Sequence, residues 1–273
     1  MIPLATLING DSPGQITAAN RGLQYGDGLF ETVAVVDGRP LLWDAHMARL
    51  QRDAHRLGFD PPPEERLTYE VAALARVHPQ AVLKIVVVRA AQGRGYRGRT
   101  RESERVVTAW PWPTLAPAGA LDIAWCATPL ARQPRLAGMK HLNRLEQVLA
   151  QNELDPACWE GLMQDTAGWV IEGTMSNVFI VSDGVLATPR LDQAGVAGVM
   201  RDQVLHRARE RGIPVIVEAL SRERVLAADE VFLTNSLMGV RTVRSLPGRV
   251  YGPPVLGPLI GKELMERGDA RAP

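Results

Sequence analysis

A lysine lies two residues after a glycine in the stretch GMKHLNRLEQVLAQ, residues 138–151, shortly before apolar residues with helical spacing. Burial against apolar side chains disfavours the charged form of an amine, and a neutral amine is a nucleophile toward carbonyl carbon. Lys140 is therefore a candidate for covalent chemistry with a carbonyl compound. The alternative is a solvated surface charge, as most lysines at helix ends are.

Two further stretches could hold a proton or an anion. Glu172, in GWVIEGTMSNVF, follows an apolar run and precedes a glycine, so it is either a site carboxylate or a solvated strand end. GVAGVMRD, residues 195–202, leads two glycines into a predicted helix. Free backbone N–H groups at a helix start favour a phosphate, unless the glycines serve only a tight turn.

Arginines provide the remaining candidates. In DAHMARL, Arg49 lies three residues after His46 on the same helical face, which is either a polar surface or a ligand contact. The stretch GRGYRGRTRESER, residues 93–105, is rich in arginine. It could grip carboxylates, stack on nucleic-acid bases, or be a solvated loop.

The first half of the chain alternates strand-like and helix-like patterns. Helices are predicted from about Asp44 to Leu57, with Gly58 as a left-handed cap, and from about Pro63 to Val77. The strand-like runs are LATLING, LFETVAVVDG, AVLKIVVVRA and RVVTAW. This pattern predicts a small α+β domain of two layers over residues 1–110. Prolines in WPWPTLAPAG block helix and central strand, so residues 111–119 are predicted to be a linker.

The second half predicts a larger domain over residues 120–273. Turn signals at SDG, residues 182–184, and DTAG, residues 165–168, favour hairpins and a mostly antiparallel barrel or sandwich. Helices are expected near 141–154 and 199–211. The inward side of the first is predicted to carry Leu142, Leu145, Val148 and Leu149.

Composition limits the possible partners. The net charge of +1 provides no general attraction to nucleic acid or to an acidic membrane. The two cysteines have no metal-ligand spacing to the five histidines, so neither a disulfide framework nor a metal site is expected. No signal-peptide pattern opens the sequence, and no apolar run approaches the roughly 18 residues of a membrane span. We expect a cytoplasmic protein without a membrane anchor.

Together and in this order, these stretches resemble the fold-type IV family of pyridoxal-phosphate enzymes. The resemblance covers nearly the whole chain and rests on YGDGLFET, DAHMARL, GRGY, MKHLNRLEQ, EGTMSNVF, PRLDQAGVAGVMRD and LTNSLM. Within the family, LAGMKHLNRLEQVLA and TPRLDQAGVAGVMR are most similar to the aminodeoxychorismate lyases. The resemblance implies an α+β fold with a small two-layer N-terminal domain and a larger C-terminal domain with an antiparallel barrel-like sheet and helices. It also implies a homodimer.

The resemblance further implies a site for pyridoxal 5'-phosphate. Lys140 would form the Schiff base with the cofactor aldehyde, and Glu172 would face the pyridine nitrogen. The residues implied for the phosphate are Arg49, Gly198, Val199, Thr234, Asn235 and Ser236. Some family members carry threonine at the positions of Met200 and Ser236, and Met200 lacks that hydroxyl.

Residues on the substrate side separate a lyase from the transaminases of the family. Phe30 and Thr32 stand where D-amino-acid transaminases have tyrosine and valine, and Arg94 and Tyr96 stand where they have arginine and histidine for a substrate carboxylate. Thr32 offers a hydroxyl near the reacting carbon, which favours a lyase that converts 4-amino-4-deoxychorismate into 4-aminobenzoate and pyruvate.

Two other functions stay open. One is a D-amino-acid or branched-chain transaminase that uses the same cofactor. The other is a non-enzymatic protein that binds RNA through the arginine-rich loop, although Glu102 and Glu104 interrupt the basic patch.

Overall fold

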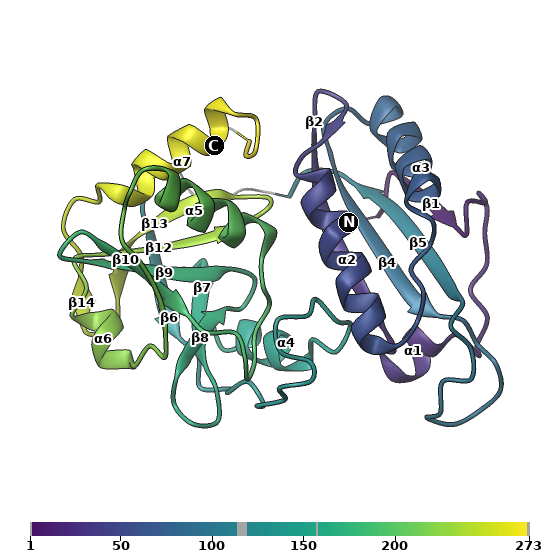
Figure 1. Cartoon of the computed structure of the whole chain (residues 1–273), viewed down its shortest axis with the longest axis horizontal. Helices are drawn as coiled ribbons and strands as arrows, with labels where there is room; N and C mark the ends of the chain where they lie inside the picture. Colours follow the sequence, from purple (N-terminus) through teal and green to yellow (C-terminus); the bar gives the residue numbers. More distant parts are fainter. Residues whose placement is uncertain (1, 114–118, 157, 272–273) are drawn as a thin grey trace. The chain divides into compact units, whose positions relative to one another are not determined.

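The computed structural model describes residues 2–113, 119–156 and 158–271 (Figure 1). The chain forms two compact units, Met1–Thr114 with Met139–Asn143, and Leu115–Gly138 with Arg144–Pro273. The predicted boundaries of 1–110, 111–119 and 120–273 stay a prediction, and residues 114–118 of the predicted linker lie outside the described residues.

The first unit is built on a five-stranded antiparallel sheet in the order β1-β5-β4-β2-β3. Its strands are β1 (Ala5–Ile8), β2 (Gly28–Val36), β3 (Arg39–Pro40), β4 (Ala81–Arg89) and β5 (Ser103–Trp110). Helices α2 (Trp43–Leu57) and α3 (Glu64–Val77) lie side by side across one face of this sheet (Figure 1). Val33, Leu83 and Ile85 are fully buried, because alternate strand residues face the helices.

The helices of the first unit follow local sequence signals. Helix α2 buries Met47, Leu50 and Ala54 and ends at Gly58, whose φ of 78° is left-handed, as predicted. Helix α3 starts after Pro63 and ends at Val77, also as predicted. A short helix, α1 (Arg21–Tyr25), precedes β2.

The second unit contains a nine-stranded sheet in the order β11-β10-β9-β12-β13-β6-β7-β8, with β14 paired to β13. Its strands are β6 (Leu121–Trp125), β7 (Glu160–Gln164), β8 (Val170–Gly173), β9 (Asn177–Ser182), β10 (Val185–Pro189), β11 (Val215–Glu218), β12 (Glu230–Asn235), β13 (Gly239–Leu246) and β14 (Arg249–Val250). The helices of this unit are α4 (Leu145–Asn152), α5 (Val199–Glu210), α6 (Arg222–Leu226) and α7 (Leu256–Glu266). The two units together confirm the predicted α+β class.

The sheet of the second unit is mostly antiparallel, as the hairpins led us to expect, but it also contains parallel pairs. The hairpins at SDG and DTAG are present, as the antiparallel pairs β9–β10 and β7–β8. However, β10–β11, β6–β7 and β6–β13 are parallel. Helix α5 connects β10 to β11, and α4 lies between β6 and β7, since a parallel pair needs a crossover connection.

The prediction for the helix near 141–154 was wrong in its start and in its inward side. Helix α4 begins only at Leu145, and Leu145, Val148 and Leu149 are 76%, 51% and 57% exposed. Residues 139–143 are not helical, because they pair with the edge of β2: the Leu142 N–H donates to the Gly28 carbonyl at 3.0 Å. This pairing outweighs the helical periodicity of the sequence.

Candidate functional site

Lys140 lies on the short segment that continues the sheet of the first unit. Its carbonyl accepts a hydrogen bond from the Phe30 N–H at 3.0 Å, so the two residues lie opposite each other. The Lys140 Nζ is 4.4 Å from the centroid of the Phe30 ring. The half-buried lysine therefore lies against the face of an aromatic ring.

Thr32 shares the sheet face that carries Phe30. The two residues are two positions apart on β2, and both are half-buried. Opposite Thr32 on β4 is Lys84, whose Nζ lies 5.3 Å from the Phe30 ring centroid. The first unit therefore brings Lys140, Phe30 and Thr32 to one face of its sheet.

Arg49 has partners that the sequence analysis did not identify. Its Nε donates to Glu31 Oε1 at 2.9 Å and its Nη2 also bonds the Glu31 carboxylate, while His46 Nδ1 lies 2.6 Å from Glu31 Oε2. Burial would raise the pKa of Glu31, but the charge and hydrogen bonds of Arg49, followed by those of His46, outweigh burial and lower the pKa to about 2. Strand alternation signalled this pairing, because Glu31 faces α2 when Phe30 and Thr32 face away.

Arg94 and Tyr96 lie in a loop between β4 and β5 without regular secondary structure. Both side chains are exposed, and Tyr96 is 89% exposed. The Tyr96 ring contacts the Tyr25 ring edge-on, with the centroids 5.5 Å apart. Two exposed donors on a loop suit an anionic ligand that arrives from solvent.

Other arginines of this stretch are engaged in ion pairs. Arg101 Nε donates to Asp60 Oδ2 at 3.1 Å. Arg105 is buried and its Nε donates to Glu70 Oε2 at 2.9 Å. These pairs neutralise part of the basic patch that an RNA-binding function would require.

Glu172 is a buried carboxylate of the second unit. It is 4% exposed, and its Oε2 accepts a hydrogen bond from the Val196 N–H at 2.7 Å. Its Oε1 lies 3.5 Å from Gln147 Nε2. Burial lowers the pKa of Arg144, and the negative charge of Glu172 acts in the opposite direction. No motif of the sequence indicated Gln147 or Arg144 as neighbours of Glu172, although they are spaced three residues apart.

The second unit also offers hydrogen-bond donors for an anion. Gly198 is the N-cap of α5, and it has no side chain to accept hydrogen bonds from the backbone N–H groups of the first helical turn, which starts at Val199. The Thr234 Oγ1 is buried and has no hydrogen-bond partner in the part of the chain that the structure describes. Asn235 folds the following turn, because its Oδ1 accepts the N–H groups of Leu237 and Met238, each at 2.9 Å. Ser236 lies in the same turn.

These features suit a cofactor with a phosphate and a cationic ring nitrogen. An uncapped helix start and an orphaned buried hydroxyl can receive phosphate oxygens, and a buried carboxylate can receive a ring N–H. Metal binding has no comparable support: within residues 2–113, 119–156 and 158–271, no group of three His, Cys, Asp or Glu side chains could hold an ion. No helix within these ranges is long and apolar enough to cross a membrane.

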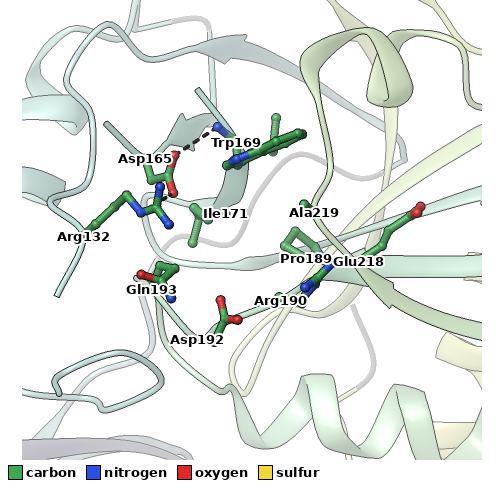
Figure 2. Close-up of a pocket in the computed structure, with 11 residues that line it drawn as sticks. Arg132, Asp165, Trp169, Ile171, Pro189, Arg190, Asp192, Gln193, Glu218 and Ala219 are labelled. Carbon is green, nitrogen blue, oxygen red and sulfur yellow. Dashed lines mark hydrogen bonds and ion pairs between the residues drawn. The ribbon is translucent and has the colours of Figure 1, made fainter. Parts of the chain in front are cut away.

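The second unit also contains a hollow of about 180 Å³, lined by both charged and apolar side chains (Figure 2). Arg132 and Asp165 point toward each other there, with Nε and Oδ2 3.6 Å apart. Asp165 Oδ1 also accepts the Trp169 N–H at 3.0 Å. None of the residues predicted for the site lines this hollow.

Comparisons with known proteins agree with this description. The family "Amino-transferase class IV" matches residues 28–246. Aminodeoxychorismate lyase of Vibrio harveyi is 36% identical over 245 residues, which are 88% of this chain and 90% of that protein. A branched-chain-amino-acid aminotransferase of Pseudomonas aeruginosa is 28% identical over 254 residues, which are 88% of this chain and 82% of that protein.

A solved structure extends the comparison to the fold. The crystal structure of 4-amino-4-deoxychorismate lyase from Pseudomonas aeruginosa has a TM-score of 0.93 and 38% sequence identity, and covers 97% of this chain and 100% of that chain. This agreement, together with the family match, confirms the fold-type IV architecture predicted from the sequence. The chain therefore belongs to the class IV amino-transferase family.

Proposed function

We propose that the chain is a pyridoxal-phosphate-dependent lyase that converts 4-amino-4-deoxychorismate into 4-aminobenzoate and pyruvate. The observation that carries this proposal is the position of Thr32, a hydroxyl on the sheet face that also holds Lys140 and Phe30. The transaminase pattern would offer only methyl groups there. Similarity to two lyases over most of the chain supports the same reaction.

The cofactor would be held by the residues that the family resemblance implies. Lys140 would provide the amine that bonds the cofactor aldehyde, and the buried Glu172 would accept a hydrogen bond from the protonated ring nitrogen. The phosphate would be bound by Gly198 and Val199, Arg49, and the turn Thr234, Asn235 and Ser236. When bound, pyridoxal phosphate supplies an electron sink for the carbon that carries the substrate nitrogen.

Lys140 would act a second time as a general base. Once the substrate amine has displaced it, the freed lysine can take the proton from the carbon that bears nitrogen. The bond between the neighbouring carbon and the enolpyruvyl oxygen then breaks, and the ring becomes aromatic. The enolpyruvate that leaves then gains a proton at its methylene carbon and becomes pyruvate. Thr32 would either deliver that proton or orient the leaving group.

Arg94 and Tyr96 would bind a substrate carboxylate, since a dianionic substrate needs oriented, charge-matched donors. Phe30 would line the same site beside Lys140. We also propose a homodimer, which the family resemblance supports.

The decisive experiment is a spectrum followed by a product assay. Protein supplied with pyridoxal phosphate should absorb at roughly 410 to 430 nm and release 4-aminobenzoate from aminodeoxychorismate. Lys140→Ala should abolish both signals, whereas Lys262→Ala, on the exposed side of α7, should change neither. An absorbing wild type that transaminates readily but forms no 4-aminobenzoate contradicts the lyase proposal.

A transaminase is the second candidate, and the similarity to a branched-chain aminotransferase favours it. D-alanine or a branched-chain amino acid, supplied with 2-oxoglutarate, measures this activity directly. Thr32→Val tests the residue that separates the candidates. The lyase proposal expects at least a tenfold loss of 4-aminobenzoate formation, and an unchanged rate would remove Thr32 from the argument.

A further inference from the structure

Arg21, which the proposed reaction does not use, is buried at the start of α1. The side chain is only 4% exposed although it carries a full charge. Its Nε donates to Asp27 Oδ2 at 2.8 Å, and its Cζ lies 5.0 Å from the centroid of the Tyr25 ring. One carboxylate and one ring face thus compensate the charge and leave both terminal nitrogens of the guanidinium for other partners.

Those nitrogens bind the backbone of the loop that carries Arg94 and Tyr96. Arg21 Nη1 donates to the Gly95 carbonyl at 2.9 Å, and Nη2 donates to the Tyr96 carbonyl at 3.0 Å. Two consecutive carbonyls can face one guanidinium here because Gly95 has a φ of 95°, which other residues rarely adopt. The Gly95 N–H in turn donates to the Tyr25 hydroxyl at 3.3 Å.

The same carboxylate anchors the far end of the loop. Arg89 Nε donates to Asp27 Oδ2 at 2.9 Å, and Arg89 Nη1 donates to the Thr100 carbonyl at 3.1 Å. Gly98 lies so close that an added Cβ would be 2.5 Å from Arg89 Nε. Asp27 therefore links two arginines: Arg21 binds the loop at residues 95 and 96, and Arg89 binds it near its C-terminal end at Thr100.

We propose that Arg21 is a positioning residue for substrate binding, which fixes the loop so that Arg94 and Tyr96 meet the substrate carboxylate in one conformation. This inference rests on the proposed function, because it assumes that these two side chains bind substrate. An exposed loop without regular structure would otherwise lose conformational entropy whenever substrate binds. Arg21 removes that loss in advance, so its role is in substrate affinity and not in the bond-breaking step.

Arginine is required for this role because its planar fork reaches two carbonyls and a carboxylate at once. Lysine keeps the charge but places its donors on a single nitrogen, so Arg21→Lys should release the loop. Tyr25→Phe removes only the acceptor of the Gly95 N–H and gives a milder, independent variant. Arg76→Lys, an exposed position on α3 of the same unit, is the matched control.

Two measurements on the folded protein test the proposal. The first is the initial rate of trypsin cleavage after Arg94, Arg97 and Arg99 in cofactor-free protein, which reports local opening of the loop. We expect about a tenfold increase for Arg21→Lys, a smaller increase for Tyr25→Phe and none for Arg76→Lys. The second is steady-state kinetics of the loaded enzyme. Arg21→Lys should raise KM about tenfold, with kcat within about twofold and the absorbance of the lysine-bound cofactor unchanged.

Each outcome decides between the alternatives. Unchanged cleavage in both Arg21→Lys and Tyr25→Phe overturns the proposal, as does a fall in kcat at constant KM. If Arg21→Lys does not fold, Tyr25→Phe decides by the same two readouts. If the wild type shows only transamination, the proposed lyase function fails, and the same rise in KM, now for the 2-oxo acid, still supports the role of Arg21.

Discussion

The buried carboxylate of Glu31 allows a quantitative test by the substitution Glu31→Gln. Glutamine keeps the size of the side chain but removes the charge that faces Arg49 and His46. The pKa of Glu31 falls from 4.5 to about 2, which corresponds to about 3 kcal/mol at about 1.4 kcal/mol per pKa unit. Removing one partner of a buried ion pair has an effect of similar size.

The sign of the pH dependence follows from the direction of that pKa. Because the folded pKa lies below the unfolded one, ionised Glu31 stabilises the fold above about pH 4.5 and loses this contribution as the pH falls toward about 2. The difference in unfolding free energy between wild type and Glu31→Gln should therefore be about 3 kcal/mol at pH 7 and about 1 kcal/mol near pH 3.

Urea unfolding of the cofactor-free protein, followed by circular dichroism from pH 7 to pH 3, measures this difference without any contribution from a bound phosphate. Glu65→Gln, in the exposed first turn of α3, controls for the loss of a surface carboxylate and should change stability by less than about 0.5 kcal/mol. A difference below about 1 kcal/mol at pH 7, or one that does not shrink with acid, would refute the reasoning.

Three further predictions concern the second unit. Glu160→Gln should lower the free energy of unfolding in urea by about 2 kcal/mol. The fully buried carboxylate accepts hydrogen bonds from surrounding N–H and O–H groups, and the amide nitrogen of glutamine would face one of these donors. Equal stability would show that the site rearranges. The Glu230 carboxylate accepts hydrogen bonds from the N–H groups of residues 255, 256 and 257 at the start of α7. Glu230→Ala should therefore speed hydrogen exchange of these amides and lower the free energy of unfolding by about 1 kcal/mol. Unchanged exchange would show that Glu230 does not cap the helix. Burial raises the pKa of Cys126 to about 12, so at pH 8 iodoacetamide should modify the half-buried Cys158 much faster, and equal rates would contradict that burial.

Helix ends were predicted correctly where a proline or glycine at the end restricts or permits a particular backbone conformation. Pro63 and Gly58 mark helix ends that depend on a fixed or a left-handed φ, and both were placed correctly. The start of α4 was missed because residues 139–143 pair with β2, which is more than a hundred residues away in sequence. The periodicity of apolar residues within a segment cannot indicate pairing with a strand so distant in sequence.

The candidate site shows the same division. Lys140 and Glu172 stand out by residue type and neighbours, and so do the glycines that precede α5. The arginines that contact the site, such as Arg21 and Arg144, could not be predicted from the sequence, because the burial of a charged residue depends on tertiary packing. Glu31 is the exception, since alternation with Phe30 could have assigned it to the face under α2.

Because residues 139–143 belong to the first unit, the two units cannot be expressed separately by cutting the chain once between them. A fragment that ends near residue 114 would contain all five strands of its sheet but would lack the segment that pairs with the outer edge of β2. Such an unpaired edge exposes free N–H and C=O groups and promotes aggregation. The fragment would also lack Lys140. A soluble first half would therefore need residues 139–143 grafted beside β2, and exchange of halves between relatives at the proline-rich stretch would separate the lysine from the strand that holds it.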